Sequence, residues 1–280
     1  MIAFRKMNGL GNDFAVVDGR KASVDLSSER IAALGNRQTG IGFDQFITLA
    51  PAMGGEDALM VIHNSDGGEV ESCGNAARCV AALLLDETGR EEVHIASAGG
   101  AMRAWRNGDG ISVDMGVPRF DAASIPLADP TANAQALLLT DPVLQAFGTA
   151  ACANVGNPHA VFWVEDVDAI DLARVGPLAE VDPAFPQKAN ISFVEIADPT
   201  RVRARVWERG AGATRACGTA ACAIGAVGHF TGRLAAKVEV TLPGGPLSID
   251  VSSGRIVMTG DYALDWTGMI TADGFSRDLR

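Results

Sequence analysis

The chain has 280 residues, of which 48% are hydrophobic and 20% are charged. This composition is typical of a folded protein and excludes collagen-like, coiled-coil and disordered chains. The formal net charge is −11 and the basic residues are scattered, so nucleic acid is not expected as a partner. The apolar run from Val80 to Leu85 is far shorter than the roughly 20 residues of a membrane span. Because Arg5 and Lys6 also stand where an export signal would be apolar, we expect a cytoplasmic protein without a membrane partner.

Short runs rich in β-branched and aromatic residues, bounded by Gly, Asp and Asn, predict strands along the first half of the chain. They cover residues 14–18, 46–49, 59–63, 93–96 and 111–115. Residues 74–87 are rich in Ala and Leu and predict a buried helix, which ends before Gly89 because glycine readily adopts the left-handed conformation. A boundary is expected near Pro118. Residues 120–142, rich in Ala, Pro and Asp, form either a linker or the opening of the second half, and residues 218–230 predict a second buried helix.

The second half of the chain repeats the first at an offset of 143 to 145 residues. The matching segments are 11–17 with 156–162, 43–47 with 188–192, 72–77 with 216–221, 88–90 with 231–233, 99–100 with 244–245, and 115–116 with 259–260. Asn64 lies nine residues before Cys73, just as Glu208 lies nine residues before Cys217. A period this long is unsuited to a solenoid and predicts two similar lobes related by an approximate two-fold axis. Strands segregated around one helix in each lobe predict an α+β fold.

Most of the five cysteines are expected to be reduced, because their number is odd and no export signal is expected, although whether Cys73 and Cys217 oxidise to a disulfide stays open. No zinc-binding spacing is present, so we expect no metal. Three cysteines are interpreted as core residues: Cys79, Cys152 and Cys222. Cys73 and Cys217 each precede a glycine at a predicted helix start, where unpaired N–H groups and the helix dipole favour a thiolate and bind anions.

Two such thiols facing each other across one cleft suit the inversion of a stereocentre next to a carboxylate. One base removes the α-proton from one face while an acid returns a proton to the other. Backbone N–H groups at the two helix starts would stabilise the charge that develops on the carboxylate oxygens. A pyridoxal phosphate route would need a lysine in a glycine-rich phosphate setting, which none of the four lysines has, so no cofactor is expected.

Four segments resemble the diaminopimelate epimerase family: residues 6–14 (KMNGLGNDF), 64–78 (NSDGGEVESCGNAAR), 156–159 (GNPH) and 207–219 (WERGAGATRACGT). The resemblance covers nearly the whole chain. It implies two lobes, residues 1–117 with 262–280 and residues 118–261, each a curled, mostly antiparallel sheet around a central helix, with the active site in the cleft between them. It also implies interconversion of LL- and meso-diaminopimelate by thiolate–thiol proton transfer, in lysine and peptidoglycan precursor biosynthesis.

The resemblance also implies a set of site residues. The catalytic thiols are those of Cys73 and Cys217, and their pKa values are tuned by His159 and Glu208. The substrate-binding residues are Asn12, Gln45, Asn64, Gly74, Asn75, Asn157, Asn190, Glu208, Arg209, Gly218 and Thr219. Arg209 aligns with Ser65 and suits a two-pronged clamp on the distal carboxylate of the substrate. Gly68 stands where the family usually has Ser, which removes a hydroxyl near the site, and Ala76 and Ala220 stand where Gly is frequent.

Alternatives remain open at this stage. One is a proline or hydroxyproline racemase, which would use the same two thiols. Its cyclic substrate, however, has no second carboxylate for Arg209 to bind. Others are a redox-active dithiol protein and a binding protein without chemistry. The further alternatives are that His159 is a structural histidine, that Glu208 is a surface carboxylate paired with Arg209, and that the two Gly-Asn pairs are ordinary turns. Whether the protein forms a homodimer, and which thiol is ionised at rest, also stay open.

Overall fold

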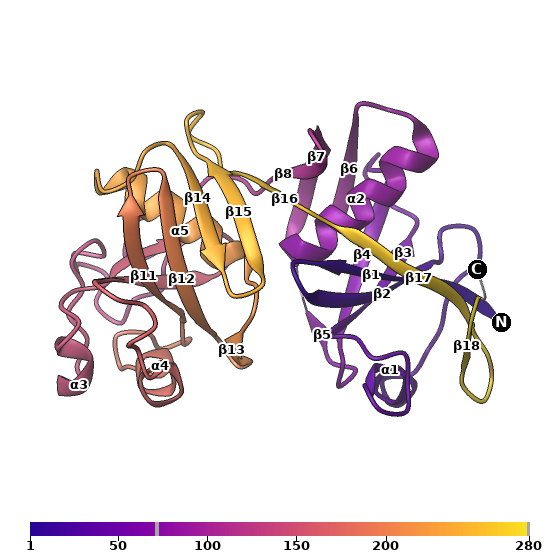
Figure 1. Cartoon of the computed structure of the whole chain (residues 1–280), viewed down its shortest axis with the longest axis horizontal. Helices are drawn as coiled ribbons and strands as arrows, with labels where there is room; N and C mark the ends of the chain where they lie inside the picture. Colours follow the sequence, from indigo (N-terminus) through magenta and orange to yellow (C-terminus); the bar gives the residue numbers. More distant parts are fainter. Residues whose placement is uncertain (71–72, 279–280) are drawn as a thin grey trace. The chain divides into compact units, whose positions relative to one another are not determined.

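The computed structural model describes residues 1–70 and 73–278, which form two compact units (Figure 1). The first unit is Met1–Val113 with the segment that begins at Thr259, and the second is Asp114–Met258. Ser72, which belongs to the cysteine motif of the first half, lies outside the described residues. Both units combine strands and helices, so the predicted α+β class is confirmed.

The first unit contains one curled run of paired strands. The strands are β1 (Ile2–Gly9), β2 (Asn12–Asp18), β3 (Gln45–Ala50), β4 (Ala58–Asn64), β5 (Glu69–Val70), β6 (Glu92–Ser97), β7 (Gly100–Asn107), β8 (Gly110–Asp114), β17 (Ala263–Ile270) and β18 (Phe275–Arg277). They pair in the order β18, β17, β1, β2, β3, β4, β6, β7, β8, and β5 also pairs with β4. Only β2–β3 and β4–β6 are parallel among these pairs. The five predicted strands of this half are therefore confirmed.

The central helix of the first unit is α2 (Gly74–Thr88), which packs against β1, β2, β6 and β7. Cys73 caps its first turn, and Gly89 follows its last turn with a φ of 64°. The helix is buried almost all round, as its Ala- and Leu-rich sequence predicts. A second helix, α1 (Ser28–Gly35), was not expected from the sequence pattern.

The second unit repeats the pairing of the first. Its strands are β9 (Ala151–Asn154), β10 (Pro158–Val164), β11 (Asn190–Asp198), β12 (Arg201–Glu208), β13 (Gly212–Thr214), β14 (Lys237–Leu242) and β15 (Gly245–Asp250), and β16 (Val257–Gly260) spans the return to the first unit. Strands β10–β11 and β12–β14 are parallel, whereas β9–β10, β11–β12, β12–β13 and β14–β15 are antiparallel. Each of these pairs has its equivalent in the first unit, as a duplicated chain requires.

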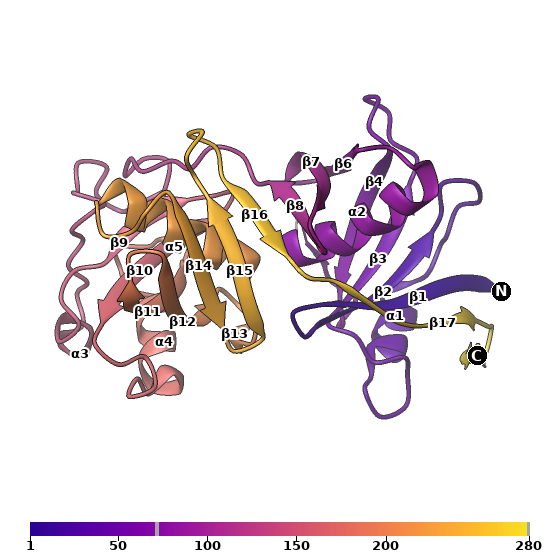
Figure 2. The same cartoon turned by 45° about the horizontal axis from the view of Figure 1, so that its top comes forward.

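Helix α5 (Gly218–Phe230) is the central helix of the second unit and confirms the predicted helix over the same residues. Figure 2 shows it among the strands of its unit, and it packs against β9, β10, β11, β14 and β15. Two glycines allow close packing of this helix: a Cβ atom at Gly225 would lie 2.6 Å from Ile249 of β15, and one at Gly228 would lie 2.3 Å from Leu234 of the loop that follows the helix. The expectation of one helix in each lobe is incomplete, because this unit also contains α3 (Pro142–Gln145) and α4 (Leu172–Glu180).

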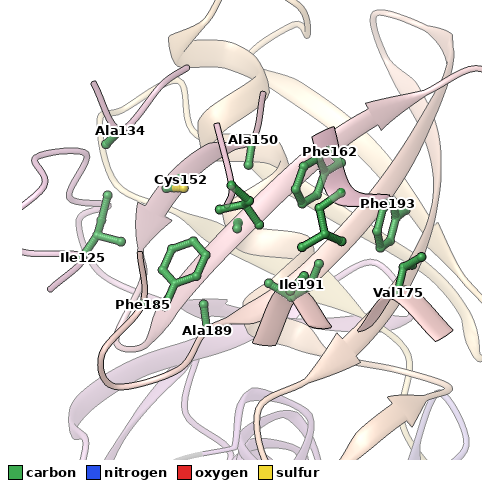
Figure 3. Packing of buried hydrophobic residues seen from close by; sticks show 14 of the residues in the cluster. Ile125, Ala134, Ala150, Cys152, Phe162, Val175, Phe185, Ala189, Ile191 and Phe193 are labelled. Atoms are coloured by element: carbon green, nitrogen blue, oxygen red, sulfur yellow. The ribbon is translucent and has the colours of Figure 1, made fainter. Parts of the chain in front are cut away.

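The segment 120–142 belongs to the second unit and is not a linker. Its buried side chains, including Ile125 and Leu139, join Phe162 and Phe193 in one hydrophobic cluster (Figure 3). Between residues 120 and 141 the backbone forms turns and an isolated bridge at Leu137. Burial of apolar side chains therefore fixes this segment where regular secondary structure does not.

Within residues 1–70 and 73–278, no helix is both long enough and apolar enough to span a membrane.

Candidate active site

In the first unit, the predicted polar residues meet at one edge of the sheet. Gln45 begins β3 opposite Phe14 of the parallel strand β2, and Asn64 ends the antiparallel strand β4 opposite Gln45. The Gln45 Nε2 donates to Asn64 Oδ1 at 3.3 Å. Asn12 is the first residue of β2, so the repeated strand pattern brings these three amides to the side on which α2 begins.

Cys73 lies at this edge because it is the N-cap of α2. Its backbone is extended, with φ −150° and ψ 110°, and its sulfur accepts a hydrogen bond from the backbone N–H of Ala76 at 3.5 Å. The sulfur also lies 3.9 Å from Asn12 Oδ1, which accepts a hydrogen bond from Asn75 Nδ2 at 3.3 Å. Cys73 is partly exposed, whereas Gly74 and Asn75 are buried in the first turn of the helix. A half-exposed thiol at a helix N-terminus is suited to carry negative charge.

Sequence reasoning missed the residues that orient Asn12. The Asn12 Nδ2 donates to Asp44 Oδ2 at 3.0 Å, which leaves the amide oxygen of Asn12 toward Cys73. Arg37 joins Asp44 and Asp13 by ion pairs of 2.7 and 2.5 Å. Asp44 stands immediately before Gln45 in the sequence, and that position was the only signal that could have found it.

Asp13 is held ionised beside Asn12. Burial alone would raise the pKa of its carboxyl group, but hydrogen bonds from Lys6 and Arg37 and the positive charges of both side chains outweigh burial, so the pKa is lowered. The Lys6 ammonium is 2.7 Å from the Asp13 carboxylate. The edge that carries Asn12 is therefore fixed by charge-assisted hydrogen bonds.

In the second unit, Cys217 occupies the equivalent position as the N-cap of α5, but its surroundings differ. Cys217 is only 5% exposed, and its sulfur lies 3.5 Å from Thr219 Oγ1. Burial and the negative charge of Glu208 raise the pKa of the Cys217 thiol well above its ordinary value. The expectation that a helix start favours the thiolate is therefore wrong for Cys217 here, because burial and a neighbouring carboxylate outweigh the helix N-terminus.

Glu208 lies at the end of β12 and is directed into the site. Its Oε1 accepts a hydrogen bond from Thr214 Oγ1 of the neighbouring strand β13. Burial raises the pKa of the Glu208 carboxyl group, and hydrogen bonds with Thr214 and Cys217 oppose that rise. The carboxylate thus accepts a hydrogen bond from the Cys217 thiol, and Glu208 is not a surface residue whose main partner is Arg209.

His159 is fully buried on β10. Burial and the positive charge of Arg209 lower the pKa of its imidazole to about 3, so the ring is neutral near pH 7. The neutral ring donates from Nε2 to Asn157 Oδ1 at 2.8 Å, and Asn157 Nδ2 lies 3.5 Å from Thr219 Oγ1. Hydrogen bonds therefore connect His159 through Asn157 and Thr219 to Cys217.

Arg209 begins the turn between β12 and β13. Its backbone N–H donates to Asn190 Oδ1 at 2.9 Å, and Asn190 Nδ2 donates to the carbonyl of Pro158 at 3.0 Å. The guanidinium of Arg209 is exposed and its Nη1 donates to the carbonyl of Gln187 at 3.2 Å. Its backbone is therefore fixed, while its charge remains available to an anion.

The structure thus brings the predicted residues together in two groups, one in each unit. The first group is Asn12, Gln45, Asn64, Cys73, Gly74 and Asn75, and the second is Asn157, His159, Asn190, Glu208, Arg209, Cys217, Gly218 and Thr219. Cys79 and Cys152 lie in the hydrophobic interior, where burial raises the pKa of each thiol to about 12. In the part of the chain that the structure describes, no group of three or more His, Cys, Asp and Glu side chains could hold a metal ion.

Comparison with known proteins identifies the family of this chain. The sequence pattern of the family "Diaminopimelate epimerase" matches residues 4–120 and 151–264. A diaminopimelate epimerase from Chromobacterium violaceum is 45% identical over 275 residues, covering 96% of this chain and 99% of the relative. One from Rhizorhabdus wittichii is also 45% identical and covers 100% of this chain and 99% of the relative. A crystal structure of a probable proline racemase from Agrobacterium radiobacter shares the fold, with a TM-score of 0.67 and 15% identity, over 98% of this chain and 94% of that chain.

Proposed function

Because this chain belongs to the diaminopimelate epimerase family, we propose that it interconverts LL- and meso-2,6-diaminopimelate by a two-base route that needs no cofactor. The observation that carries the proposal is the pair of thiols at equivalent helix starts, Cys73 before α2 and Cys217 before α5. The two lobes, residues 1–117 with 262–280 and residues 118–261, would enclose the substrate in a cleft with one thiol on each side of the reacting carbon.

The different surroundings of the thiols assign their roles in the first step. Cys217 carries its proton and donates a hydrogen bond to Glu208, so it is the acid. Cys73 donates as a thiol to Asn12 Oδ1 and accepts a hydrogen bond from Ala76 at the N-terminus of α2, where loss of its proton leaves a stabilised thiolate, so we assign it as the base. The Cys73 thiolate takes the α-proton, the electron pair of the broken C–H bond passes to the α-carbon and its carboxylate, and Cys217 delivers its proton to the opposite face. In the reverse direction the two thiols exchange roles.

The intermediate carbanion needs stabilisation at the carboxylate next to the reacting carbon. The first turns of α2 and α5 present the backbone N–H groups of Gly74, Asn75, Gly218 and Thr219. Such groups stabilise negative charge that grows during the reaction, without having to reorient.

The rest of the substrate is held by the polar residues of the two groups. Asn12, Gln45, Asn64, Asn157 and Asn190 offer amide donors and acceptors to its ammonium and carboxylate groups. Arg209 binds the distal carboxylate, which proline does not have, and this favours diaminopimelate over a cyclic imino acid.

The experiment replaces each thiol separately. We expect Cys73→Ala and Cys217→Ala each to lower kcat for LL-diaminopimelate by a factor on the order of a thousand, because each removes one proton-transfer group. Cys152→Ala is the matched control, since Cys152 is a buried core cysteine, and its kcat is expected to stay near that of the wild type. Full epimerase activity in Cys217→Ala, or turnover of proline in preference to diaminopimelate, would refute the proposal.

The same proposal sets the cellular role. The product meso-diaminopimelate would feed lysine and peptidoglycan precursor synthesis, and the enzyme would act in the cytoplasm. Recovery of the chain in the membrane or exported fraction of its own cells would contradict this placement.

A further inference from the structure

A buried carboxylate outside the predicted site holds the turn that carries Arg209. Glu180, the last residue of α4, is 7% exposed and accepts three hydrogen bonds. Trp207 Nε1 donates to its Oε2 at 2.7 Å, while the backbone N–H of Gly210 and the ammonium of Lys188 donate to its Oε1 at 3.0 and 3.3 Å. Two of these three donors flank Glu208 and Arg209 in the sequence.

The surface of α4 is shaped to place this carboxylate. The indole ring of Trp207 lies against Gly176, where a Cβ atom would come within 2.5 Å of the ring. Glu180 is four residues after Gly176, so both lie on the same face of the helix. The glycine admits the ring, and the carboxylate one turn later receives the indole N–H.

Glu180 is ionised despite its burial. Burial would raise the pKa of its carboxyl group, but the hydrogen bonds from Trp207, Gly210 and Lys188 and the charge of Lys188 together lower it. Hydrogen bonds to an ionised acceptor are roughly twice as strong as neutral ones. The carboxylate is therefore a firm anchor for the Gly210 backbone.

The two site residues on this turn depend on that anchor to different extents. Glu208 is held independently, because Thr214 donates to its side chain and its backbone pairs with Gly212. Arg209 adjoins Gly210, and its remaining contacts are to Asn190 and the carbonyl of Gln187. Loss of the Glu180 anchor would thus disturb Arg209 more than Glu208.

We propose that Glu180 is a positioning residue that acts through Arg209 to set the affinity of the enzyme for the distal carboxylate of its substrate. This inference rests on the proposed function, since it assigns Arg209 to that carboxylate. It predicts an effect on KM with little effect on kcat, because the thiols and Glu208 keep their own contacts.

The test is a double-mutant cycle with steady-state kinetics on LL-diaminopimelate. Glu180→Gln keeps the side-chain size but removes the charge and one acceptor, and we expect KM to rise about tenfold with kcat within about threefold of the wild type. Arg209→Ala should raise KM further. The double variant should show the KM of Arg209→Ala alone, because a residue that acts through Arg209 has no effect once Arg209 is gone.

Several outcomes separate a positioning role from a general structural one. The inference would be overturned if the KM effects of Glu180→Gln and Arg209→Ala multiplied in the double variant. An unchanged KM in Glu180→Gln would also overturn it. Glu195→Gln is the matched control, because Glu195 also anchors a loop of this unit, through the Val167 N–H, and its KM should stay unchanged. If Glu180→Gln fails to fold, Lys188→Met removes only the ammonium donor and should give a smaller rise in KM that Arg209→Ala likewise abolishes.

A structural readout keeps the inference distinct from the proposed function. Glu180→Gln should accelerate hydrogen exchange of the Gly210 amide, whereas an unchanged rate would overturn the anchoring role whatever the reaction. A wild-type chain inactive on diaminopimelate would refute the proposed function, and with it the assigned role of Arg209. An active wild type with unaltered KM in Glu180→Gln would refute this inference alone.

Discussion

Two cysteines in the same local position have different chemical properties, because their neighbours differ. Cys73 and Cys217 both cap a helix, yet Cys73 is partly exposed beside an amide whereas Cys217 is buried beside Glu208. The sequence repeat identifies the equivalence of the two positions. The difference between them arises from residues that the repeat does not share, since Glu208 aligns with Asn64.

His159 makes the stability of the protein depend on pH. Its imidazole pKa is about 3 in the folded state, whereas an unfolded histidine titrates near 6.5, so between these values only the unfolded state binds the proton. The contribution of His159 to the unfolding free energy is therefore fully present above about pH 6.5. It is lost as the pH falls toward 3, at about 1.4 kcal/mol per pH unit.

His159→Gln, which can still donate a hydrogen bond but does not titrate, should remove this dependence. We expect the wild type to lose about 2 kcal/mol more unfolding free energy than the variant between pH 7 and pH 5, as measured by urea denaturation. Parallel losses in the two proteins would show that His159 is not buried in its neutral form.

Much of the candidate site could be predicted at the residue scale, but not its supporting residues. The repeat identifies the two cysteines and pairs Asn12 with Asn157 and Gln45 with Asn190, and the family resemblance implied the rest of the set. Asp44, Thr214 and Glu180 have no such signature, because each acts on a site residue through a contact that forms only when the strands and helices pack. Their roles follow from the folded geometry alone.

The elements differ in how clearly the sequence predicts them. The two central helices have long runs of Ala, Leu and other apolar residues, followed by a glycine after the last turn, and their predicted bounds agree with the structure to within one residue. Helix α1 has eight residues and α4 has nine, and α4 contains Pro177. Short amphipathic segments and an internal proline weaken the helical signal, so tertiary packing decides those elements.

Helix α5 packs closely against β15 at Gly225, and a substitution there tests this contact. At an open helix position, Gly→Ala stabilises by up to about 1 kcal/mol, but here the new Cβ would overlap Ile249. We therefore expect Gly225→Ala to lower the unfolding free energy by about 1–3 kcal/mol.

The partner substitution provides the control. Ile249→Leu, which removes the overlapping Cγ2 methyl group but keeps the side-chain volume, should partly restore stability in the double variant, as measured by the denaturation midpoint. A stabilising Gly225→Ala would mean that α5 does not lie against β15 at this point.

At the scale of the whole molecule, duplication accounts for the architecture. The same order of parallel and antiparallel pairs surrounds α2 and α5, and β17 returns along the chain to pair with β1 of the first unit. Short β-branched and aromatic runs around one apolar helix in each half were sufficient to predict the α+β class. The return of the C-terminal segment came from family resemblance, because no local pattern specifies which distant strand becomes a neighbour.

Each unit contributes one thiol, so the proposed reaction requires the whole chain. A two-base route predicts that the proton removed and the proton delivered are different atoms, since they reside on different sulfurs. A single base would return the proton that it had just removed.

The most direct measurement follows the α-hydrogen of LL-diaminopimelate during turnover in heavy water. At low conversion, we expect the meso product to carry deuterium at the inverted carbon while the remaining LL substrate keeps its original hydrogen, because the donating thiol has already exchanged with solvent. A meso product that retains the hydrogen of the substrate would contradict the two-thiol account.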